Sequence, residues 1–184
     1  MSFNTQNEIL LNKLMIYYNE NKNLNKMLNI INGESKISLR IIDWFATNYA
    51  KKNYIVYNII KNNSKEERFK VYDDYKLKLK AYSKKRFDPF CRWDRITIPY
   101  KNDTYIQTTI GQLNFFRWAL ENKILDYIEK NLKHINNDMN NRNSTAKNRK
   151  EKSTTKTRKK REELSISASK SIKKEQVEII VDFK

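Results

Sequence analysis

The sequence predicts an α+β fold that is mostly helical and is organised around one long central helix. Residues 108–133 carry apolar side chains at helical spacing, whereas residues 95–108 alternate like two short strands around a turn. After Ile135 the composition becomes polar and basic. We therefore expect a helical domain at residues 1–135 with a β-hairpin at about 95–108, a basic disordered linker at 136–162 and a C-terminal β-strand pair at 163–184.

The central helix is expected to be buried on more than one side. A second set of large side chains widens its main apolar stripe, and so much apolar surface needs cover from several neighbours. Thr109 followed by Gln112 fits a capping box at its start. The stripe comprises Leu113, Phe116, Leu120, Ile124, Tyr127 and Ile128, and the flanking set comprises Phe115, Trp118, Leu125 and Leu132.

Three further helices are predicted before this one. Residues 5–18, 23–31 and 39–51 each repeat apolar residues at helical spacing. Gly33 follows the second helix and is expected to be its C-cap. Ser38 is expected to be the N-cap of the third helix.

Two segments are open between helix and strand. Residues 54–60 (YIVYNII) are β-branched and aromatic, and periodicity does not decide between the two. Residues 69–82 fit both patterns, and the length of the run favours a helix. Pro89 is expected to end that helix, with Asp88 extended before it. Pro99 marks the first hairpin strand as an edge, because proline has no N–H to donate.

The C-terminal part is not expected to form a core of its own. Residues 142–161 contain ten Lys or Arg against one Glu, a net charge of +9, with too few apolar side chains to pack. Residues 164–172 and 176–183 then alternate like strands. Because two strands alone are marginally stable, we expect this pair to dock on the main domain or on a partner.

The composition favours a polyanionic partner. The 184 residues carry a formal net charge of +17, from 38 Lys and Arg against 21 Asp and Glu. This balance favours DNA, RNA or an anionic surface. Frequent Asn, Lys, Ile and Tyr indicate an A/T-rich genome, so codon bias is an alternative source of the charge. No signal peptide and no membrane-spanning run is visible, and Cys91, the only cysteine, cannot form an intramolecular disulfide, which indicates a reducing compartment.

The residue inventory argues against an enzyme. One His and one Cys exclude a zinc finger or a Cys/His metal cluster, and the isolated Gly33 and Gly111 exclude a phosphate-binding glycine loop. We therefore expect no cofactor and no bound metal. His134 is expected to be a solvated residue near a helix end, where its partial positive charge suits the helix dipole.

Two alternatives involving reactive side chains are weighed against simpler interpretations. A metal-dependent nuclease would have one plausible carboxylate cluster, formed by Asp73, Asp74, Asp88 and Asp94 with Lys84 or Lys85. The favoured interpretation places the first two carboxylates on a solvated helix face and pairs the last two with Arg92 or Arg95. Cys91 beside Arg92 fits a reactive thiol, although a buried small side chain is the more common case.

Two basic segments are the candidate nucleic-acid contacts, because each Lys or Arg on a phosphate releases counterions and gives a steep salt dependence. The segment beside Tyr82 comprises Lys76, Lys78, Lys80, Lys84, Lys85 and Arg86. The segment in the linker comprises Arg142, Lys147, Arg149, Lys150, Lys152, Lys156, Arg158, Lys159, Lys160 and Arg161. The linker segment has no aromatic side chain for stacking on bases, so a sequence-independent contact is expected from it. The simpler alternative is a solvated linker inflated by codon bias.

Four segments carry a resemblance to a known group of proteins. They are SLRIIDWFATNYAKK at 38–52, LKAYSKKRFDPFCR at 79–92, TTIGQLNFFRWALENKILDYI at 108–128 and RKKREELSISASKSI at 158–172. Together they resemble small uncharacterised proteins of giant nucleocytoplasmic large DNA viruses of the mimivirus type. The resemblance implies an A/T-rich viral genome, replication in the host cytoplasm and packaging in the virion, and it brings no catalytic or binding residue with it.

The leading hypothesis is a non-enzymatic basic viral protein that binds nucleic acid, DNA rather than RNA, mainly through phosphate contacts. The alternative is a virion structural or assembly protein that acts through protein–protein contacts, with the C-terminal strands binding another virion protein. Either protein would act in the host cytoplasm, at the viral factory, or in the virion. Residues 157–161 (TRKKR) resemble a nuclear-import signal and add the nucleus as a further location.

Overall fold

The computed structural model describes residues 5–20, 23–60, 66–91, 94–100, 104–152 and 174–176. Five helical segments and one hairpin come first: α1 (Gln6–Glu20), α2 (Asn23–Ile31), α3 (Leu39–Trp44), the π-helical turn η1 (Phe45–Tyr49), α4 (Ala50–Lys52), β1 (Val56–Ile60) and β2 (Glu66–Lys70). They are followed by α5 (Val71–Phe87), β3 (Arg95–Pro99), β4 (Thr104–Thr109), α6 (Ile110–Glu121), α7 (Ile124–Lys130), α8 (Leu132–Lys152) and β5 (Lys174–Gln176). The predicted α+β class with a helical majority is confirmed.

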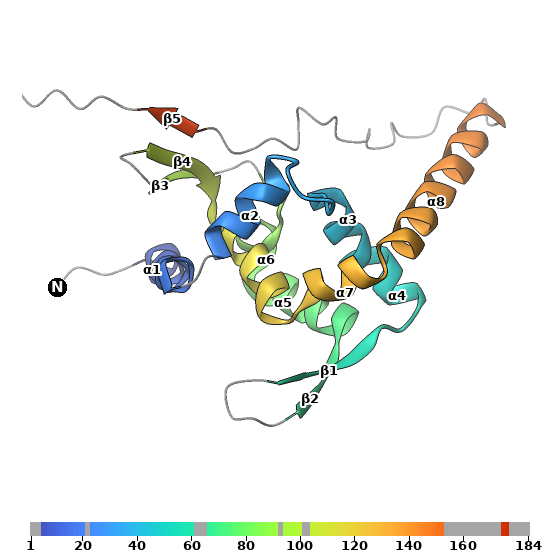
Figure 1. Cartoon of the computed structure of the whole chain (residues 1–184), viewed down its shortest axis with the longest axis horizontal. Helices are drawn as coiled ribbons and strands as arrows, with labels where there is room; N and C mark the ends of the chain where they lie inside the picture. The colour runs from blue at the N-terminus through green and yellow to red at the C-terminus, as the bar shows by residue number, and fades with distance from the viewer. Residues whose placement is uncertain are drawn as a thin grey trace, which may run out of the picture.

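Helix α6 is the centre of the body, with α1, α2 and α5 around it (Figure 1). Its start is the predicted one, since the Thr109 Oγ1 accepts a hydrogen bond from the Gln112 N–H at 3.2 Å. Phe115 and Phe116 are fully buried, as is Leu113. Even the polar Gln112 and Asn114 are buried, so α6 is covered on almost every side.

The long helix expected at residues 108–133 is wrong in its extent, because asparagines break it into α6, α7 and the start of α8. The Asn122 side chain donates to the Trp118 carbonyl at 2.8 Å and ends α6, and Lys123 follows with a left-handed φ of 53°. Asn131 donates in the same way to the Tyr127 carbonyl at 2.9 Å and ends α7. In both cases the backbone N–H of the same asparagine also donates to that carbonyl, at 3.2 Å, so each asparagine closes the last helical turn twice.

The ring-lined centre of the body lies between α5 and α6. Phe87 is 1% exposed, and its ring lies 5.8 Å from that of Phe115 and 5.6 Å from that of Trp118, centroid to centroid. Gly111 permits this close approach, because a Cβ there would lie 2.9 Å from the Lys85 carbonyl oxygen and 3.0 Å from that of Asp88. Pro89 ends α5 as predicted, with Asp88 extended at φ −93° and ψ 119°.

Two small antiparallel sheets complete the fold. The first is the β1–β2 hairpin, in which Val56 pairs with Lys70 and Ile60 with Glu66. The open question at residues 54–60 is thus settled as a strand from Val56. At residues 69–82 the favoured helix is confirmed from Val71 onward, whereas Phe69 and Lys70 belong to β2.

The second sheet has the strand order β3-β4-β5, in which the predicted β3–β4 hairpin is confirmed and β3, the strand that contains Pro99, is an edge. The described strand β5 lies between the two predicted C-terminal strands and shares only Gln176 with the second of them. It pairs with β4 on the main domain. The predicted strand at 164–172, and all of the predicted strand at 176–183 except Gln176, lie outside the described residues.

The disordered linker expected at 136–162 is wrong for residues 136–152, which belong to the helix α8. The first half of α8 contributes to the core through Ile135 and Met139, which are 0% and 8% exposed. Its second half leaves the body and extends away from the other helices (Figure 1). Residues 153–162 of the predicted linker lie outside the described residues.

Candidate nucleic-acid interface

Helix α5 presents most of its predicted basic residues to solvent. Lys76, Lys80, Lys84 and Lys85 are exposed, and no carboxylate of the described residues lies within ion-pair distance of any of the four. The last two follow Ser83, whose φ of 63° and ψ of 168° kink the helix. Unpaired lysines on a solvated face are available to phosphates.

Two lysines from different elements meet at one ring. Lys76 Nζ lies 5.6 Å from the centroid of the Tyr72 ring, and Lys51 Nζ of α4 lies 5.6 Å from the same centroid. A ring face attracts a cation through its quadrupole. Neither ammonium group has a carboxylate partner among the described residues. Positive charge from α4 and α5 is therefore concentrated around Tyr72.

Helix α8 is attached to the same region through Asp138. Lys52 of α4 donates to Asp138 Oδ1 at 2.8 Å, and the Trp44 Nε1 donates to Oδ2 at 3.2 Å. Burial opposes ionisation of this carboxyl, but the hydrogen bonds from Lys52 and Trp44 outweigh it and hold the pKa of Asp138 below its ordinary value. One turn later the Arg142 guanidinium lies over the Trp44 ring at 5.7 Å.

These contacts define one surface, here named the basic band. It runs from Lys76 and Lys80 on α5, through Lys51 and Lys52 on α4, to α8. On α8 the backbone of Arg142, Lys147, Arg149, Lys150 and Lys152 is helical, and the only acidic residue between them is Glu151. Of the predicted contacts, Lys156, Arg158, Lys159, Lys160 and Arg161 lie outside the described residues.

Two predicted contacts on α5 lie apart from the basic band. Arg86 is half-buried and holds α1, since its Nε donates to Asn7 at 2.7 Å and its Nη1 donates to Gln6 at 3.0 Å. Lys78 lies instead in a groove of about 1470 Å³ that also contains Asp74 and Trp118. Sequence reasoning missed Lys51, Lys52 and Tyr72, because only the fold brings α4 against α5 and α8.

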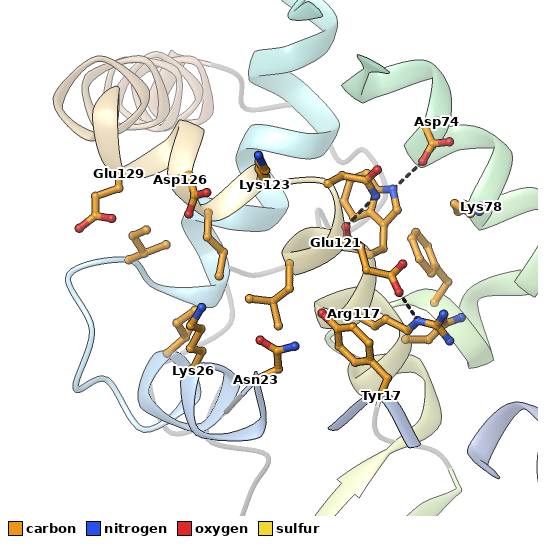
Figure 2. Close-up of a pocket in the computed structure, with 18 of the residues that line it drawn as sticks. Tyr17, Asn23, Lys26, Asp74, Lys78, Arg117, Glu121, Lys123, Asp126 and Glu129 are labelled. Atoms are coloured by element: carbon orange, nitrogen blue, oxygen red, sulfur yellow. Dashed lines mark hydrogen bonds and ion pairs between the residues drawn. The ribbon is translucent and has the colours of Figure 1, made fainter. Parts of the chain in front are cut away.

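The groove is lined by residues of α1, α2, α5, α6 and α7, together with residues 34–37, Ile60 and Glu67. Figure 2 shows the contact of Arg117 with Glu121, at 2.7 Å, and that of the Trp118 indole with Asp74, at 2.6 Å. Its basic lining residues are Lys13, Lys26, Lys36, Lys78, Arg117 and Lys123, and its acidic ones are Glu34, Glu67, Asp74, Glu121, Asp126 and Glu129. Because the two sets are equal in number, the groove has no excess of positive charge.

The carboxylates of the weighed nuclease site do not form one cluster. Asp73 is exposed as expected, but Asp74 is half-buried on the Trp118 indole. Asp88 accepts from the Phe90 N–H at 2.9 Å, and Arg95 donates to Gln107. The expected pairing of Asp88 or Asp94 with Arg95 is therefore wrong. The other expected partner, Arg92, lies outside the described residues. Within the described part of the chain no three His, Cys, Asp or Glu side chains could together hold a metal ion.

The lone His and Cys occupy unremarkable places. His134 is exposed, as expected. It lies in the first turn of α8, however, and not in the last turn of a helix, where a partial positive charge would suit the helix dipole. Cys91 is a free thiol and is half-buried, between the two weighed alternatives of an exposed reactive group and a buried one.

One carboxyl that sequence reasoning did not single out is electrostatically unusual. Asp43 is the fifth of the six residues of α3, two positions before the π-helical turn η1 begins, and it is half-buried. Burial, and then the nearby Asp88 carboxylate, raise the pKa of Asp43 to about 6. The fold thus holds a carboxylate where its charged form is disfavoured.

We expect Asp43→Asn to stabilise the protein by about 1–2 kcal/mol at pH 7 and to have little effect at pH 4. A folded-state pKa above the unfolded value of 3.8 means that the unfolded chain ionises first as the pH rises. The wild type therefore loses stability between about pH 4 and pH 6 and does not regain it above. Urea unfolding of both proteins at the two pH values measures the difference.

The control for this experiment is Glu129→Gln, because Glu129 is exposed on α7. It should give no comparable gain at pH 7. If Asp43→Asn and wild type have equal free energies of unfolding at both pH 7 and pH 4, the Asp43 carboxyl is solvated and its charged form is not disfavoured by the fold.

Comparison with known proteins places the chain in a family. The model of a family of unknown function, DUF7197, matches residues 2–184, and the chain belongs to this family. Among curated proteins it is similar to the uncharacterised protein L507 of Acanthamoeba polyphaga mimivirus, with 50% identity over 131 residues, which cover 68% of this chain and 49% of the relative. The chain thus spans about half the length of that relative. The predicted resemblance to uncharacterised giant-virus proteins is confirmed.

No solved structure matches this chain. Among the described helices, none has the length and apolar character needed to cross a membrane.

Proposed function

We propose that this protein is non-enzymatic and binds nucleic acid, DNA rather than RNA, mainly through phosphate contacts along the basic band. The observation that carries the proposal is the meeting of Lys51 and Lys76 at Tyr72 without a carboxylate partner in the described part of the chain. Bringing two like charges from separate elements to one place costs free energy. A bound phosphate would offset that cost.

The projecting part of α8 supports DNA as the partner. An α-helix with its side chains is about 10–12 Å wide, and the major groove of B-form DNA is about 12 Å wide. The major groove of an A-form RNA duplex is narrow and deep and does not admit side chains readily. A helix that extends beyond the body and carries five basic residues can lie against a DNA groove with phosphates on both sides.

A salt titration tests the proposal. We expect the affinity of the full chain for a short blunt DNA duplex to fall steeply between about 50 and 200 mM salt. Lys51→Gln with Lys76→Gln should lower the log–log slope by about 2, since each lost phosphate contact removes about 0.9. Fluorescence anisotropy of a labelled duplex measures both slopes.

The matched control changes two lysines of the charge-balanced groove, Lys13→Gln with Lys36→Gln. Both double variants lose two positive charges, so a general effect of net charge would lower both slopes equally. Unequal slopes, with the groove variant like wild type, support the basic band. If the two double variants have equal slopes, the basic band is not the phosphate contact. If wild type does not bind the duplex at about 50 mM salt, the proposal fails.

The alternative, a virion structural or assembly protein, is supported by the charge-balanced groove, which suits a partner carrying both signs of charge. It would replace the nucleic-acid proposal if DNA binding is negligible at low salt while Lys78→Glu together with Asp126→Lys abolishes co-purification with a defined virion protein. Retained co-purification of that variant would exclude the groove as the contact.

A further inference from the structure

Tyr54 is the one tyrosine that the fold leaves in solvent. All eleven tyrosines lie in the described part of the chain, and the other ten are buried or half-buried. Tyr54 is 86% exposed, more than any other large apolar side chain that the structure exposes. An abundance of tyrosine through codon bias explains the number of rings, but it does not explain why this ring is unpacked.

The backbone of Tyr54 lies in an ordered turn. Tyr54 has a left-handed φ of 48°, which is unfavourable for a residue with a Cβ. The turn is closed on both sides, since the Asn53 N–H donates to the Tyr49 carbonyl at 3.0 Å and the Ile55 N–H donates to that of Ala50 at 3.2 Å. The Asn53 side chain also donates to the Tyr49 carbonyl at 3.0 Å. Tyr54 is therefore presented by an ordered turn between α4 and β1.

Two lysines of the basic band shortly precede Tyr54 in the chain. Lys51, Lys52 and Asn53 are all exposed, and Lys51 precedes Tyr54 by three residues. Lys51 has no carboxylate partner in the described residues, whereas Lys52 is 54% exposed in its contact with Asp138. An exposed ring three residues after a lysine that has no carboxylate partner in the described residues supplies both parts of a nucleotide site, a flat face for the base and a charge for the phosphate.

We propose that Tyr54 is a stacking platform for an unpaired nucleobase and that Lys51 binds the adjoining phosphate. This inference rests on the proposed function and adds a substrate class to it: single strands, or duplexes with unpaired bases. Stacking on an aromatic face is independent of base identity, because every base has a π-face. Bases inside a blunt duplex are already stacked on each other, so Tyr54 adds nothing to binding of a blunt duplex.

The experiment compares full-length wild type, Tyr54→Ala and Tyr54→Phe on two ligands of equal phosphate number, a thymidine single strand and a blunt duplex, in about 50 mM salt. Tyr54→Ala is expected to weaken single-strand binding roughly 5- to 150-fold, the range for loss of one stacked base, and to leave duplex binding unchanged. Tyr54→Phe keeps the ring and should bind both ligands like wild type. Leu77→Ala, which removes a 65% exposed side chain of α5, should also bind both like wild type.

A second measurement reads stacking without relying on affinity. Tyr54→Trp should show added fluorescence, relative to wild type, that the single strand quenches and the blunt duplex does not. Unchanged single-strand binding by Tyr54→Ala, or an equal loss on both ligands, would overturn the stacking role while leaving the proposed function in place. If wild type binds neither ligand at this salt concentration, both the stacking role and the proposed function fail.

Discussion

Replacing the five basic residues of α8 by glutamine is expected to lower the log–log salt slope of duplex DNA binding by about four to five. The residues are Arg142, Lys147, Arg149, Lys150 and Lys152. Electrostatic contributions vanish near about 1 M salt, so the plots of log affinity against log salt concentration for wild type and variant should meet there. At about 0.2 M salt the variant should then bind roughly a thousandfold more weakly than wild type. Anisotropy titrations at several salt concentrations give both quantities.

The matched control for α8 neutralises five lysines of the charge-balanced groove: Lys13, Lys26, Lys36, Lys78 and Lys123. In the variant that lacks the five basic residues of α8, circular dichroism should show the helix retained, because glutamine has a helix propensity close to those of lysine and arginine. The control should keep most of the wild-type slope. A control slope that drops as far as the α8 slope would mean that binding follows net charge alone and that the projecting helix has no special part.

Replacing Phe87 by alanine is expected to lower the free energy of unfolding by about 3–5 kcal/mol. Its ring is 1% exposed and contacts the rings of Tyr75 and Tyr82 as well as those of Phe115 and Trp118. Removing it leaves a cavity between α5 and α6, and the Gly111 contact with the α5 backbone limits how far the two helices can close over it. Urea unfolding monitored by circular dichroism measures the loss.

Two further variants serve as controls for Phe87→Ala. Phe87→Leu should lose less than Phe87→Ala, because it leaves a smaller void. Leu77→Ala on the solvent side of α5 should change stability by no more than about 0.5 kcal/mol, since Leu77 is 65% exposed. If Phe87→Ala is as stable as Leu77→Ala, the ring contacts between α5 and α6 do not hold the body together.

Several features could be predicted from the sequence because each has a local cause. The Ser38 and Thr109 side chains accept the N–H bonds expected of N-caps, from Ile41 at 3.3 Å and from Gln112 at 3.2 Å. Gly33 has the left-handed φ of 79° expected after α2. Pro89 ends α5 because proline restricts the residue before it. A few neighbouring residues are enough to determine such features.

The broken central helix could also have been read from the sequence. Asn53, Asn122 and Asn131 each follow an aromatic residue by four positions and donate to its carbonyl at a helix end. Asparagine suits helix ends, because it tolerates left-handed backbone and its short amide can bond to nearby carbonyls. The prediction of an unbroken helix rested on the apolar stripe alone and did not use these three residues.

The helical structure of the expected linker and the basic band could not be predicted without the fold. The second half of α8 has almost no apolar residues, and composition alone indicates disorder. The burial of Ile135 and Met139 starts a helix that the following residues continue, and no Gly or Pro stops it before Lys152. Lys51 and Lys76 are far apart in sequence, so their meeting at Tyr72 follows from the packing of α4 on α5.

The anchoring of α8 at one end makes it a lever. Its buried side chains Ile135 and Met139 lie in its first half, and the thirteen residues after Met139, up to Lys152, extend roughly 20 Å at the helical rise. A turn of about 10° at the Asp138 attachment would move the far end by roughly 3 Å, which is about the spacing of successive phosphates along the axis of one DNA strand. Small changes around Trp44 and Lys52 would thus move the far end of α8 along a duplex by about one nucleotide, while its attached end stays in place.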